Sequence, residues 1–537
     1  MTTVRRHGAL LALLALGLAL RVVLAWGLFP NAGYASDLGQ FREWATALAA
    51  NGPGRFYETV SSGNYPPGYL YVLWLLGTLD ATGLLKLPAI LADLGIAVLL
   101  YALGTRWRDA RTGLVAAGLF LFLPVSWYAS ALWGQVDAVG TMVVLAALLL
   151  LVDGWSEAAL VTAVLAVLVK PQYAIGLAIV LPVLVRRHLL RPGSGPVPVL
   201  RSRFARIDAA LGGAMRDQGP RRFASSLLIA AVVGIAVILP FDLATYAPAS
   251  LADVPVISSV AGLIGLFARL GSEFSVLTAN AFNPWALVGS PSLASVVGSG
   301  SGSWLADTAP GLAGLQPVTV GAGLLVVVGA LVAGGLLVRD GLVPIVLGFT
   351  ILALAFFVLP TRVHERYLFP FFATAALLAA PAASRIAGYV VMSVLGTVNL
   401  HAVLAGNLEI GLVGGRGGAG SGPGGLGGAP GGFPGGGGLG VGGRPGGFGG
   451  GGGGFGSGFK AIDLPWADIA RSEPAVIAVA VGGAVALLVL VTVWIVLIRG
   501  PGTAATVALA PVPQAPAAAF DASEASIPSI EDREPLA

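Results

Sequence analysis

The sequence predicts an all-α polytopic membrane protein. Hydrophobic residues make up 56% of the 537 positions, and charged residues make up only 10%. A soluble domain carries roughly 25% charged residues. The few charges of this chain could not cover the water-facing surface of a soluble fold of this size. Long apolar segments also recur along the chain, and many approach the roughly 20 residues that a membrane-spanning helix needs. A compact soluble fold is therefore excluded.

The apolar segments predict a bundle of about 12 transmembrane helices with outer-face loops and juxtamembrane helices. They lie at about residues 8–28, 86–104, 112–130, 136–153, 156–170, 171–186, 224–240, 315–338, 341–360, 367–382, 385–405 and 475–498. The first segment is long, carries Arg21 and lacks a clear small-residue cleavage site, so we expect a retained anchor instead of a signal peptide.

The segment 66–79 is apolar but is not expected to span the membrane. It has 14 residues and begins with two prolines. At ~1.5 Å per residue a helix of this length reaches only ~21 Å, short of a ~30 Å hydrocarbon core. We expect an interfacial or re-entrant helix there.

The distribution of arginine predicts the orientation. Arginines are concentrated in two short loops, at 105–111 and 186–222. Cytoplasmic loops carry the excess of Lys and Arg, so these loops and both termini are expected in the cytoplasm. Three polar regions, 29–85, 241–314 and 406–474, then face the outside.

Composition divides the chain into four parts. Residues 1–405 form the expected transmembrane domain, 406–474 a glycine-rich flexible extracytoplasmic loop, 475–498 an additional C-terminal transmembrane helix, and 499–537 a disordered cytoplasmic tail. Glycine dominates residues 411–458, and such a composition cannot bury a core.

Ionisable residues gather at the outer ends of the predicted helices. Charges in such places are costly unless they pair or function. The group comprises Asp37, Glu43, Lys86, Asp93, Asp137, Lys170, Arg362, His364, Glu365 and Arg366. The cytoplasmic ends carry ordinary arginine anchors, and this asymmetry predicts a functional site at the outer face.

Two aspartates are candidates for a catalytic base. Asp37 opens an expected amphipathic helix in the first outer loop, and Asp137 starts the helix predicted at 136–153. Each aspartate is explained either as a helix N-cap or as a functional carboxylate. Near Asp137, Gln135 is suited to hydrogen-bonding a sugar and Trp133 to stacking on it.

Basic residues in two loops are candidates for binding an anion. Lys170 lies in the Lys170-Pro171-Gln172 break between two apolar runs, where a lysine that snorkels to the interface is the alternative. The loop 361–370 holds Arg362, His364, Glu365 and Arg366. If this loop is helical, the two arginines share a face and form a fork suited to phosphate; a loop held by an Arg–Glu pair is the alternative.

The residue types also limit the cofactors. The chain has no cysteine, and His364 has only a remote second histidine, so a zinc site is not expected. It has neither a Walker-type loop nor a dinucleotide fingerprint. We expect no tightly bound cofactor and no nucleic-acid partner, and the need for a divalent metal stays open.

With these segments in place, the chain resembles the GT-C glycosyltransferases, multispanning enzymes that take a sugar from a polyprenyl-phosphate carrier on the non-cytoplasmic face. It is most similar to the prokaryotic mannosyltransferase-like branch related to the second mannosyltransferase of GPI-anchor assembly. The resemblance covers residues 8–405 and rests on Asp37 with Trp44, Tyr65-Pro66-Pro67-Gly68, Lys86-Leu87-Pro88 with Asp93, Ala131-Leu132-Trp133-Gly134-Gln135-Val136-Asp137, Lys170-Pro171-Gln172, Asn280-Ala281-Phe282-Asn283-Pro284-Trp285 and His364-Glu365-Arg366-Tyr367.

The resemblance implies an inverting hexosyltransferase of the plasma membrane, with mannose as the expected sugar and an extracytoplasmic active site. Its first-loop base falls on Asp37, with Asp137 as the second catalytic candidate. The residues expected to bind the sugar and lipid phosphate are Lys86, Gln135, Lys170, Gln172, Arg362, His364, Glu365 and Arg366. Many such enzymes carry an acidic pair in the first loop; here Ser36 replaces one member, which argues against a tightly bound metal.

The expected partners are a polyprenyl-phosphate sugar, an acceptor glycan, lipid or protein, and membrane lipids. The competing class is a transporter or flippase for a lipid-linked or anionic substrate, which would carry charges near the bilayer midplane. A non-catalytic scaffold that keeps the fold is a third alternative.

Overall fold

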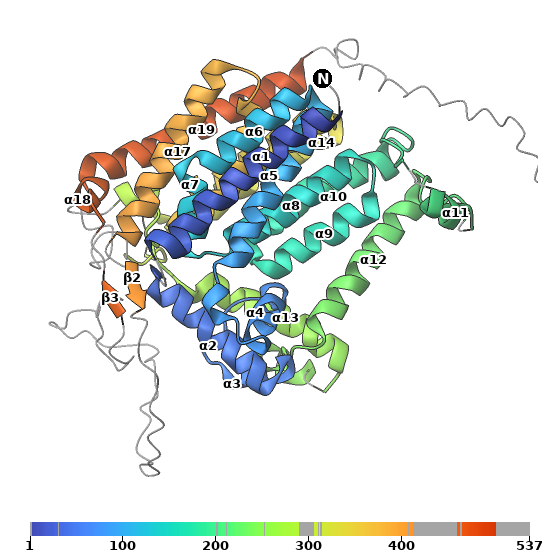
Figure 1. The fold of residues 1–537 in the computed structure, drawn as a ribbon. Coiled ribbons are helices and arrows are strands. Elements are labelled where there is room, and N and C mark those ends of the chain that lie inside the picture. The colour runs from blue at the N-terminus through green and yellow to red at the C-terminus, as the bar shows by residue number, and fades with distance from the viewer. Residues whose placement is uncertain are drawn as a thin grey trace, which may run out of the picture.

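The computed structural model describes residues 3–29, 32–199, 202–210, 212–251, 253–288, 305–309, 311, 314–405, 408–411, 459–461 and 464–500. Most of the predicted glycine-rich loop and all of the tail after residue 500 lie outside these ranges. The described chain is a helical bundle with one small sheet (Figure 1).

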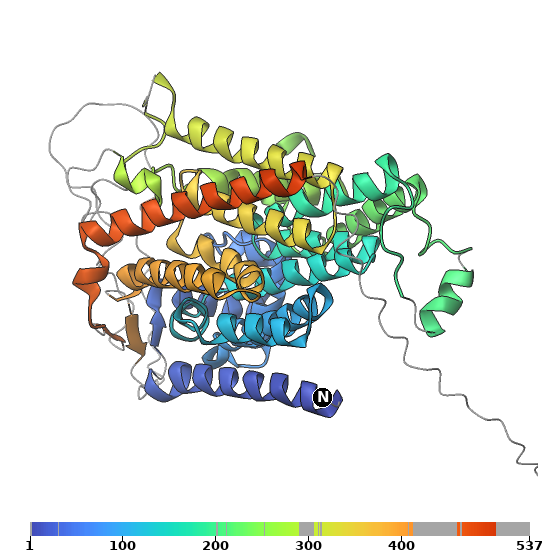
Figure 2. The same cartoon turned by 90° about the horizontal axis from the view of Figure 1, so that it is seen from above.

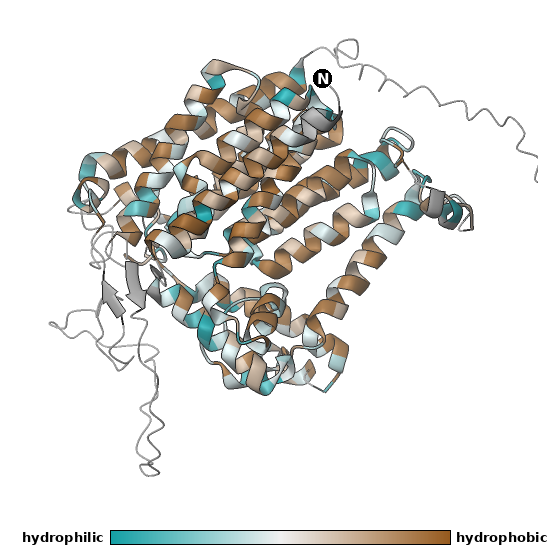
Figure 3. Ribbon diagram, in the orientation of Figure 1, coloured by the Kyte–Doolittle hydropathy of each residue, from teal (hydrophilic) through white to brown (hydrophobic). Residues whose placement is uncertain are grey.

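Helices occur at all 12 segments predicted from apolar runs. They are α1 (Thr3–Val22), α5 (Leu87–Trp107), α6 (Ala110–Phe122), α8 (Asp137–Val152), α9 (Ser156–Val169), α10 (Ala174–Val185), α12 (Pro220–Ile238), α14 (Pro317–Val338), α15 (Leu342–Val358), α16 (Phe369–Ala379), α17 (Ala383–Leu404) and α19 (Glu473–Arg499). They pack side by side, with α1 at one edge (Figure 2). Apolar residues run along these helices, and polar residues gather toward the ends (Figure 3).

The predicted number of spans is not confirmed. Among the described residues, 8 helices are long and apolar enough to cross a membrane, or 9 if α6 and the segment Pro124–Trp133, bent by 53°, form one broken span. The helices α8, α9, α15 and α16 have only 16, 14, 17 and 11 residues. All four begin or end near the predicted site residues, where polar side chains and prolines interrupt the apolar runs.

A second layer of helices covers one end of the bundle (Figure 1). It consists of α2 (Ala35–Asn51), α3 (Phe56–Thr59), α4 (Pro67–Thr78) and α13 (Pro255–Glu273). Helix α4 has 12 residues, too few to cross a hydrocarbon core. Helix α13 was not expected, because it lies in a region predicted as an outer loop, yet it is one of the 8 candidate spans. The layer has an apolar core of its own, which includes Phe41, Trp44, Phe56, Tyr69 and Phe241.

Short helical elements connect these layers. They include η1 (Val23–Leu28), η3 (Thr82–Leu84), α7 (Pro124–Trp127), η4 (Tyr128–Trp133), η5 (Pro171–Tyr173), η6 (Arg186–Leu190), α11 (Ser202–Ala210), η13 (Glu365–Leu368) and α18 (Ala467–Ala470). Three of them, η4, η5 and η13, interrupt the bundle on the side of α2 and carry or border the predicted site residues.

A three-stranded antiparallel sheet departs from the all-α prediction. Strand β2 (Leu408–Gly411) lies between β1 (Ala32–Tyr34) and β3 (Phe459–Ala461), with Gly33 opposite Glu409 and Ile410 opposite Lys460. The two segments that flank the glycine-rich tract therefore pair with each other and with the first outer loop. Such short strands are specified by long-range pairing and leave little pattern in the sequence.

Candidate active site

Side chains from four separate segments meet at the end of the bundle that α2 covers. They come from α2, from the turn between η4 and α8, from η5 and from η13. The charge of Asp37 is close enough to act on both Lys170 and Arg366. The segments are up to 329 positions apart, so only the tertiary fold brings these groups together.

Asp37 is oriented by two neutral donors. Its Oδ2 accepts a hydrogen bond from Trp133 Nε1 at 2.8 Å and another from Gln135 Nε2. The N-cap of α2 is Tyr34, and no side chain caps this helix end, so Asp37 is not the N-cap. Tyr34 stacks on the Trp133 ring with centroids 4.8 Å apart. Asp37 is thus held in place without an ion pair.

Gly134 shapes the turn that supplies both donors. Its φ is +87°, a left-handed conformation that glycine adopts without strain. A Cβ at this position would lie 2.8 Å from Leu38 Cδ2, so a side chain would also push against the start of α2. The turn therefore directs Trp133 and Gln135 toward the same carboxylate.

Asp137 lies in a different environment from Asp37. It is fully buried, and its Oδ1 accepts hydrogen bonds from Lys170 Nζ and Gln172 Nε2, both at 2.9 Å. The N-cap of α8 is Val136, and no side chain caps that end either. Lys170 is 5% exposed, so it does not snorkel to the surface. Asp137 and Lys170 form a buried ion pair.

Close packing of η5 against α8 makes this ion pair possible. A Cβ at Gly140 would lie 2.0 Å from the Tyr173 ring, so only glycine allows the two elements to approach this closely. The Tyr173 hydroxyl donates to the backbone carbonyl of Asp137 at 2.6 Å. The lysine and glutamine of η5 are thereby placed beside the Asp137 carboxylate.

The third part of the site is the Glu365–Arg366 pair in η13. Arg366 contacts Glu365 Oε1 at 2.8 Å and lies over the Trp133 ring, 5.9 Å from its centroid. Burial raises the pKa of Glu365, and the neighbouring Arg366 opposes this shift. Burial also lowers the pKa of His364 well below its usual value, and the charge of Arg366 lowers it further, so His364 is neutral at pH 7.

Several buried polar atoms of this group have no hydrogen-bond partner among the described residues. They are Asp137 Oδ2, Gln172 Oε1, Glu365 Oε2 and Arg366 Nε. Buried polar groups in native proteins are normally satisfied, so unsatisfied atoms concentrated in one place are typical of a binding site. Three acceptor oxygens and one donor are thus available there to a polar ligand.

Arg362 does not belong to this group, contrary to the prediction of an arginine fork. Its φ is +66°, and the helical turn begins only at Glu365, so Arg362 and Arg366 share no helix face. Arg362 Nε instead contacts the buried carboxylate of Asp307 at 2.6 Å. Thr361 Oγ1 donates to the same carboxylate at 2.7 Å. Arg362 therefore anchors a loop.

Lys86 packs near the Gly134 turn, but neither Lys86 nor Arg21 makes a polar contact with this group among the described residues. Lys86 Nζ donates to the Ala131 carbonyl at 2.8 Å and hydrogen-bonds to neither Asp37 nor Asp137. Arg21 was expected either to reach the lipid phosphate or to snorkel, and it does neither. It is fully buried and pairs with Asp93 at 2.7 Å, so it joins α1 to α5.

Metal ligands do not cluster in the described part of the chain. No group of three or more His, Asp or Glu side chains there is arranged to hold a metal ion. Asp37 accepts hydrogen bonds from an indole and an amide, and Asp137 accepts them from an ammonium group and an amide. Neither is grouped with a second carboxylate that could complete a metal site in the described part of the chain. We therefore assign no residue to a metal.

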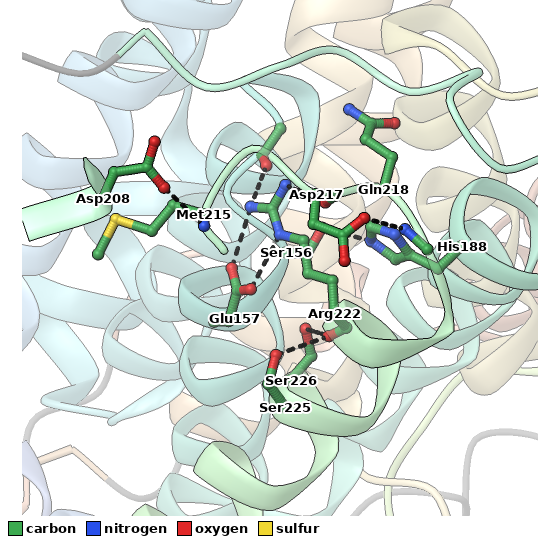
Figure 4. Close-up of polar contacts among 12 residues, drawn as sticks. Ser156, Glu157, His188, Asp208, Met215, Asp217, Gln218, Arg222, Ser225 and Ser226 are labelled. Atoms are coloured by element: carbon green, nitrogen blue, oxygen red, sulfur yellow. Dashed lines mark hydrogen bonds and ion pairs between the residues drawn. The ribbon is translucent and has the colours of Figure 1, made fainter. Parts of the chain in front are cut away.

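A second polar cluster lies between α9, η6 and α12, and sequence reasoning had predicted only arginine anchors there (Figure 4). Arg222 forms two bonds to the carboxylate of Glu157, at 2.9 and 3.0 Å, and Ser156 Oγ contacts His188 Nε2 at 2.9 Å. Arg222 is buried and its charge is matched by Glu157. Because the charge is paired and the contacts join neighbouring helices, we assign this cluster a structural role.

The fold and the Asp37 group define a polytopic α-helical membrane protein with an ionisable site at one end of its bundle. No family model matches the chain, and no curated protein matches its sequence. Solved structures of the archaeal oligosaccharyltransferase from Archaeoglobus fulgidus are similar to it over part of the fold.

One of these structures, a complex with an inhibitory peptide and a dolichol-phosphate, has 14% sequence identity and a TM-score of 0.36; the match covers 74% of this chain and 52% of that one. A second, tethered to an acceptor peptide, has 14% identity and a TM-score of 0.36, covering 72% and 50%. The apo form has 15% identity and a TM-score of 0.35, covering 72% and 51%. The chain thus spans about half the length of these proteins.

Proposed function

We propose that the protein is a membrane glycosyltransferase that moves a hexose from a polyprenyl-phosphate donor to an extracytoplasmic acceptor hydroxyl by an inverting single displacement. Mannose is the proposed sugar. The observation that carries the proposal is the pair of differently held aspartates, beside which several buried polar atoms lack partners. The GT-C resemblance of the sequence motifs is consistent with this chemistry.

The environments of the two aspartates divide their roles. The charge of Asp137 is already matched by Lys170, and the carboxylate is fully buried. Asp37 is only partly buried and is held by neutral donors, so it is free to accept a proton. A general base must be positioned and unprotonated, and it must be able to reach the acceptor hydroxyl. We assign the base to Asp37 and sugar binding to Asp137.

The reaction then proceeds in one step. The acceptor oxygen attacks the anomeric carbon while its proton moves to Asp37. The bond between the anomeric carbon and the phosphate oxygen breaks, and the polyprenyl phosphate leaves with the bonding electrons. Arg366 and Lys170 stabilise the negative charge that develops on this leaving group, because fixed cations away from bulk water are effective at that task.

Gln135 and Gln172 complete the proposed sugar site. Gln172 donates to Asp137 and has an unpartnered carbonyl oxygen, which leaves one acceptor for a sugar hydroxyl. Gln135 holds Asp37, so it positions the base. The Trp133 ring is buried, stacks on Tyr34 and contacts Arg366, so it supports both the proposed base and the cation proposed to meet the lipid phosphate.

The experiment that tests the proposal is transfer of labelled sugar by the purified protein. Synthetic polyprenyl-phosphate mannose and glucose are offered separately, each with extracted membrane glycolipids as acceptors, and a nucleotide sugar is offered alone as the control. Labelled product from a lipid-linked donor supports the proposal. Product from the nucleotide sugar, with none from either lipid donor, rules it out.

A further inference from the structure

Lys86 differs from every other buried basic side chain in the described part of the chain. Six lysine or arginine side chains are buried there: Arg21, Lys86, Lys170, Arg186, Arg187 and Arg222. Five of them form ion pairs with a carboxylate. Lys86 is 5% exposed, and its single hydrogen bond goes to the carbonyl of Ala131. Its charge has no partner among the described residues.

A buried ammonium without a counter-charge is unfavourable. Burial removes its hydration, and one carbonyl replaces only one of the three hydrogen bonds that the group can donate. Such a group is either neutralised or matched by an anion that binds. Two of the Lys86 donors remain for that purpose.

Lys86 lines a small hollow that is partly open to the outside. The lining residues are Ala25, Trp26, Leu38, Arg42, Thr82, Gly83, Leu85 and Lys86. Arg42 is the second cation, and no ion pair holds its side chain within the described ranges. The hollow therefore has two basic side chains and no carboxylate in its lining.

The surroundings of this hollow are apolar. It lies against η1 and η3. These two elements carry exposed hydrophobic side chains, among them Val23, Leu28 and Leu84, which are 50%, 64% and 42% exposed. The spanning segment Gly8–Leu28 that contributes Ala25 and Trp26 is only 22% buried inside the protein, as expected of a helix that faces lipid. A ligand that fits here has an anionic head beside an apolar tail.

We propose that the hollow between Lys86 and Arg42 binds the phosphate of a lipid, next to the Gly134 turn but without sharing a polar contact with the Asp37 group. The lipid is either the polyprenyl-phosphate carrier or a membrane phospholipid, which share this chemistry. The carrier alternative rests on the proposed function, whereas the anion site itself does not.

Binding is measured on the purified full-length protein in an uncharged detergent, by thermal shift and by native mass spectrometry. The probes are geranyl phosphate, dihexanoyl phosphatidylglycerol, inorganic phosphate and, as an uncharged control, geraniol. The variants are Lys86→Met, which keeps the apolar stem, Arg42→Gln, and the control Arg55→Gln. Arg55 is exposed on the neighbouring layer and pairs only with exposed Glu58.

Lys86→Met should weaken lipid-phosphate binding by at least about tenfold, and Arg42→Gln by less because that side chain is exposed. Without ligand, Lys86→Met should melt no lower than the wild type, because it removes an uncompensated buried charge. If Lys86 had a purely structural role, Lys86→Met would instead lower the melting temperature and leave lipid-phosphate binding unchanged. Arg55→Gln should change neither quantity.

The probes separate the two sources. Stabilisation by geranyl phosphate but not by the phosphatidylglycerol supports the carrier, and the reverse supports a phospholipid. The proposal is overturned if no lipid phosphate binds, if Lys86→Met binds as the wild type does, or if inorganic phosphate or geraniol binds as tightly as the lipids. An Asp37→Asn variant that binds the probe but transfers no sugar would separate this site from catalysis. If the wild type binds the probe normally but transfers no sugar, the result counts against the proposed function and leaves the lipid-phosphate site standing.

Discussion

Replacing Asp37 with asparagine removes the proposed proton acceptor and little else. Asp37 Oδ2 accepts hydrogen bonds from Trp133 Nε1 at 2.8 Å and from Gln135 Nε2. The amide oxygen of an asparagine is able to accept both bonds. Each bond changes from charge-assisted to neutral, which lowers stability by about 1 kcal/mol per bond. The fold and donor binding should survive.

The expected effect on turnover is much larger than the effect on stability. A positioned general base contributes roughly 10²- to 10⁴-fold in rate. This range corresponds to a barrier increase of about 2.7–5.5 kcal/mol. We therefore expect kcat to fall at least ~100-fold, with little change in the donor KM, since Asp37 is not assigned to donor binding.

The assay is transfer of labelled sugar from a synthetic polyprenyl-phosphate donor, with melting temperature as the folding control. Glu43→Gln is the matched variant, because Glu43 is an exposed carboxylate on the same helix, and it should retain full activity. Asp137→Asn should instead destabilise the protein by about 3–5 kcal/mol, since it leaves Lys170 buried without its carboxylate. Normal turnover by Asp37→Asn, together with an inactive but folded Asp137→Asn, would reverse the two roles and refute the reasoning.

The remaining predictions use separate measurements. Arg366→Ala should lower kcat/KM for the donor by roughly 100-fold and lower kcat/KM for the acceptor less. Equal losses for the two substrates would indicate that Arg366 has only a structural role. Arg362→Ala should lower the free energy of unfolding by about 3 kcal/mol, because it leaves the buried carboxylate of Asp307 unpaired, and a chemical denaturation curve like that of the wild type would contradict this. Burial lowers the folded-state pKa of His364, so the folded protein binds fewer protons there than the unfolded chain, and stability falls as pH drops through about 6.5. His364→Gln should reduce that fall by up to about 1.4 kcal/mol per pH unit, measured by melting at several pH values. Parallel stability curves for the variant and the wild type would contradict this. A topology reporter fused to the C-terminal end should read cytoplasmic and one within 420–450 external, and the opposite pair of signals would refute the predicted orientation.

The class of the protein and the positions of its bundle helices followed from the sequence. A chain with 10% charged residues and repeated apolar runs has few alternatives to a membrane-embedded bundle, because the bilayer requires every spanning backbone to satisfy its own hydrogen bonds. Helices occur at all 12 predicted segments. The segments around Asp37, Asp137, Lys170 and Arg366 were singled out for a related reason, since ionisable residues in apolar surroundings stand out as exceptions.

Helix lengths and the small sheet could not be obtained this way. A hydropathy pattern does not reveal where a helix stops, and α15 and α16, with 17 and 11 residues, are shorter than the predicted segments 341–360 and 367–382. The pairing of β1 with β2 joins residues that are more than 370 positions apart. Neither the length of a helix at a polar break nor a pairing at that separation is determined by the local sequence.

The tertiary structure alone decided which charges meet. From the sequence, Arg362 and Arg366 were equal candidates, and Asp37 was only narrowly preferred to Asp137 as the base. Packing pairs Arg362 with Asp307 and Asp137 with Lys170, and it leaves Asp37 with neutral donors and Lys86 with a single carbonyl. Local sequence determines what a residue can bind, but its partner is the group that the fold places within about 3 Å, where desolvation makes an ion pair or an unpaired charge matter.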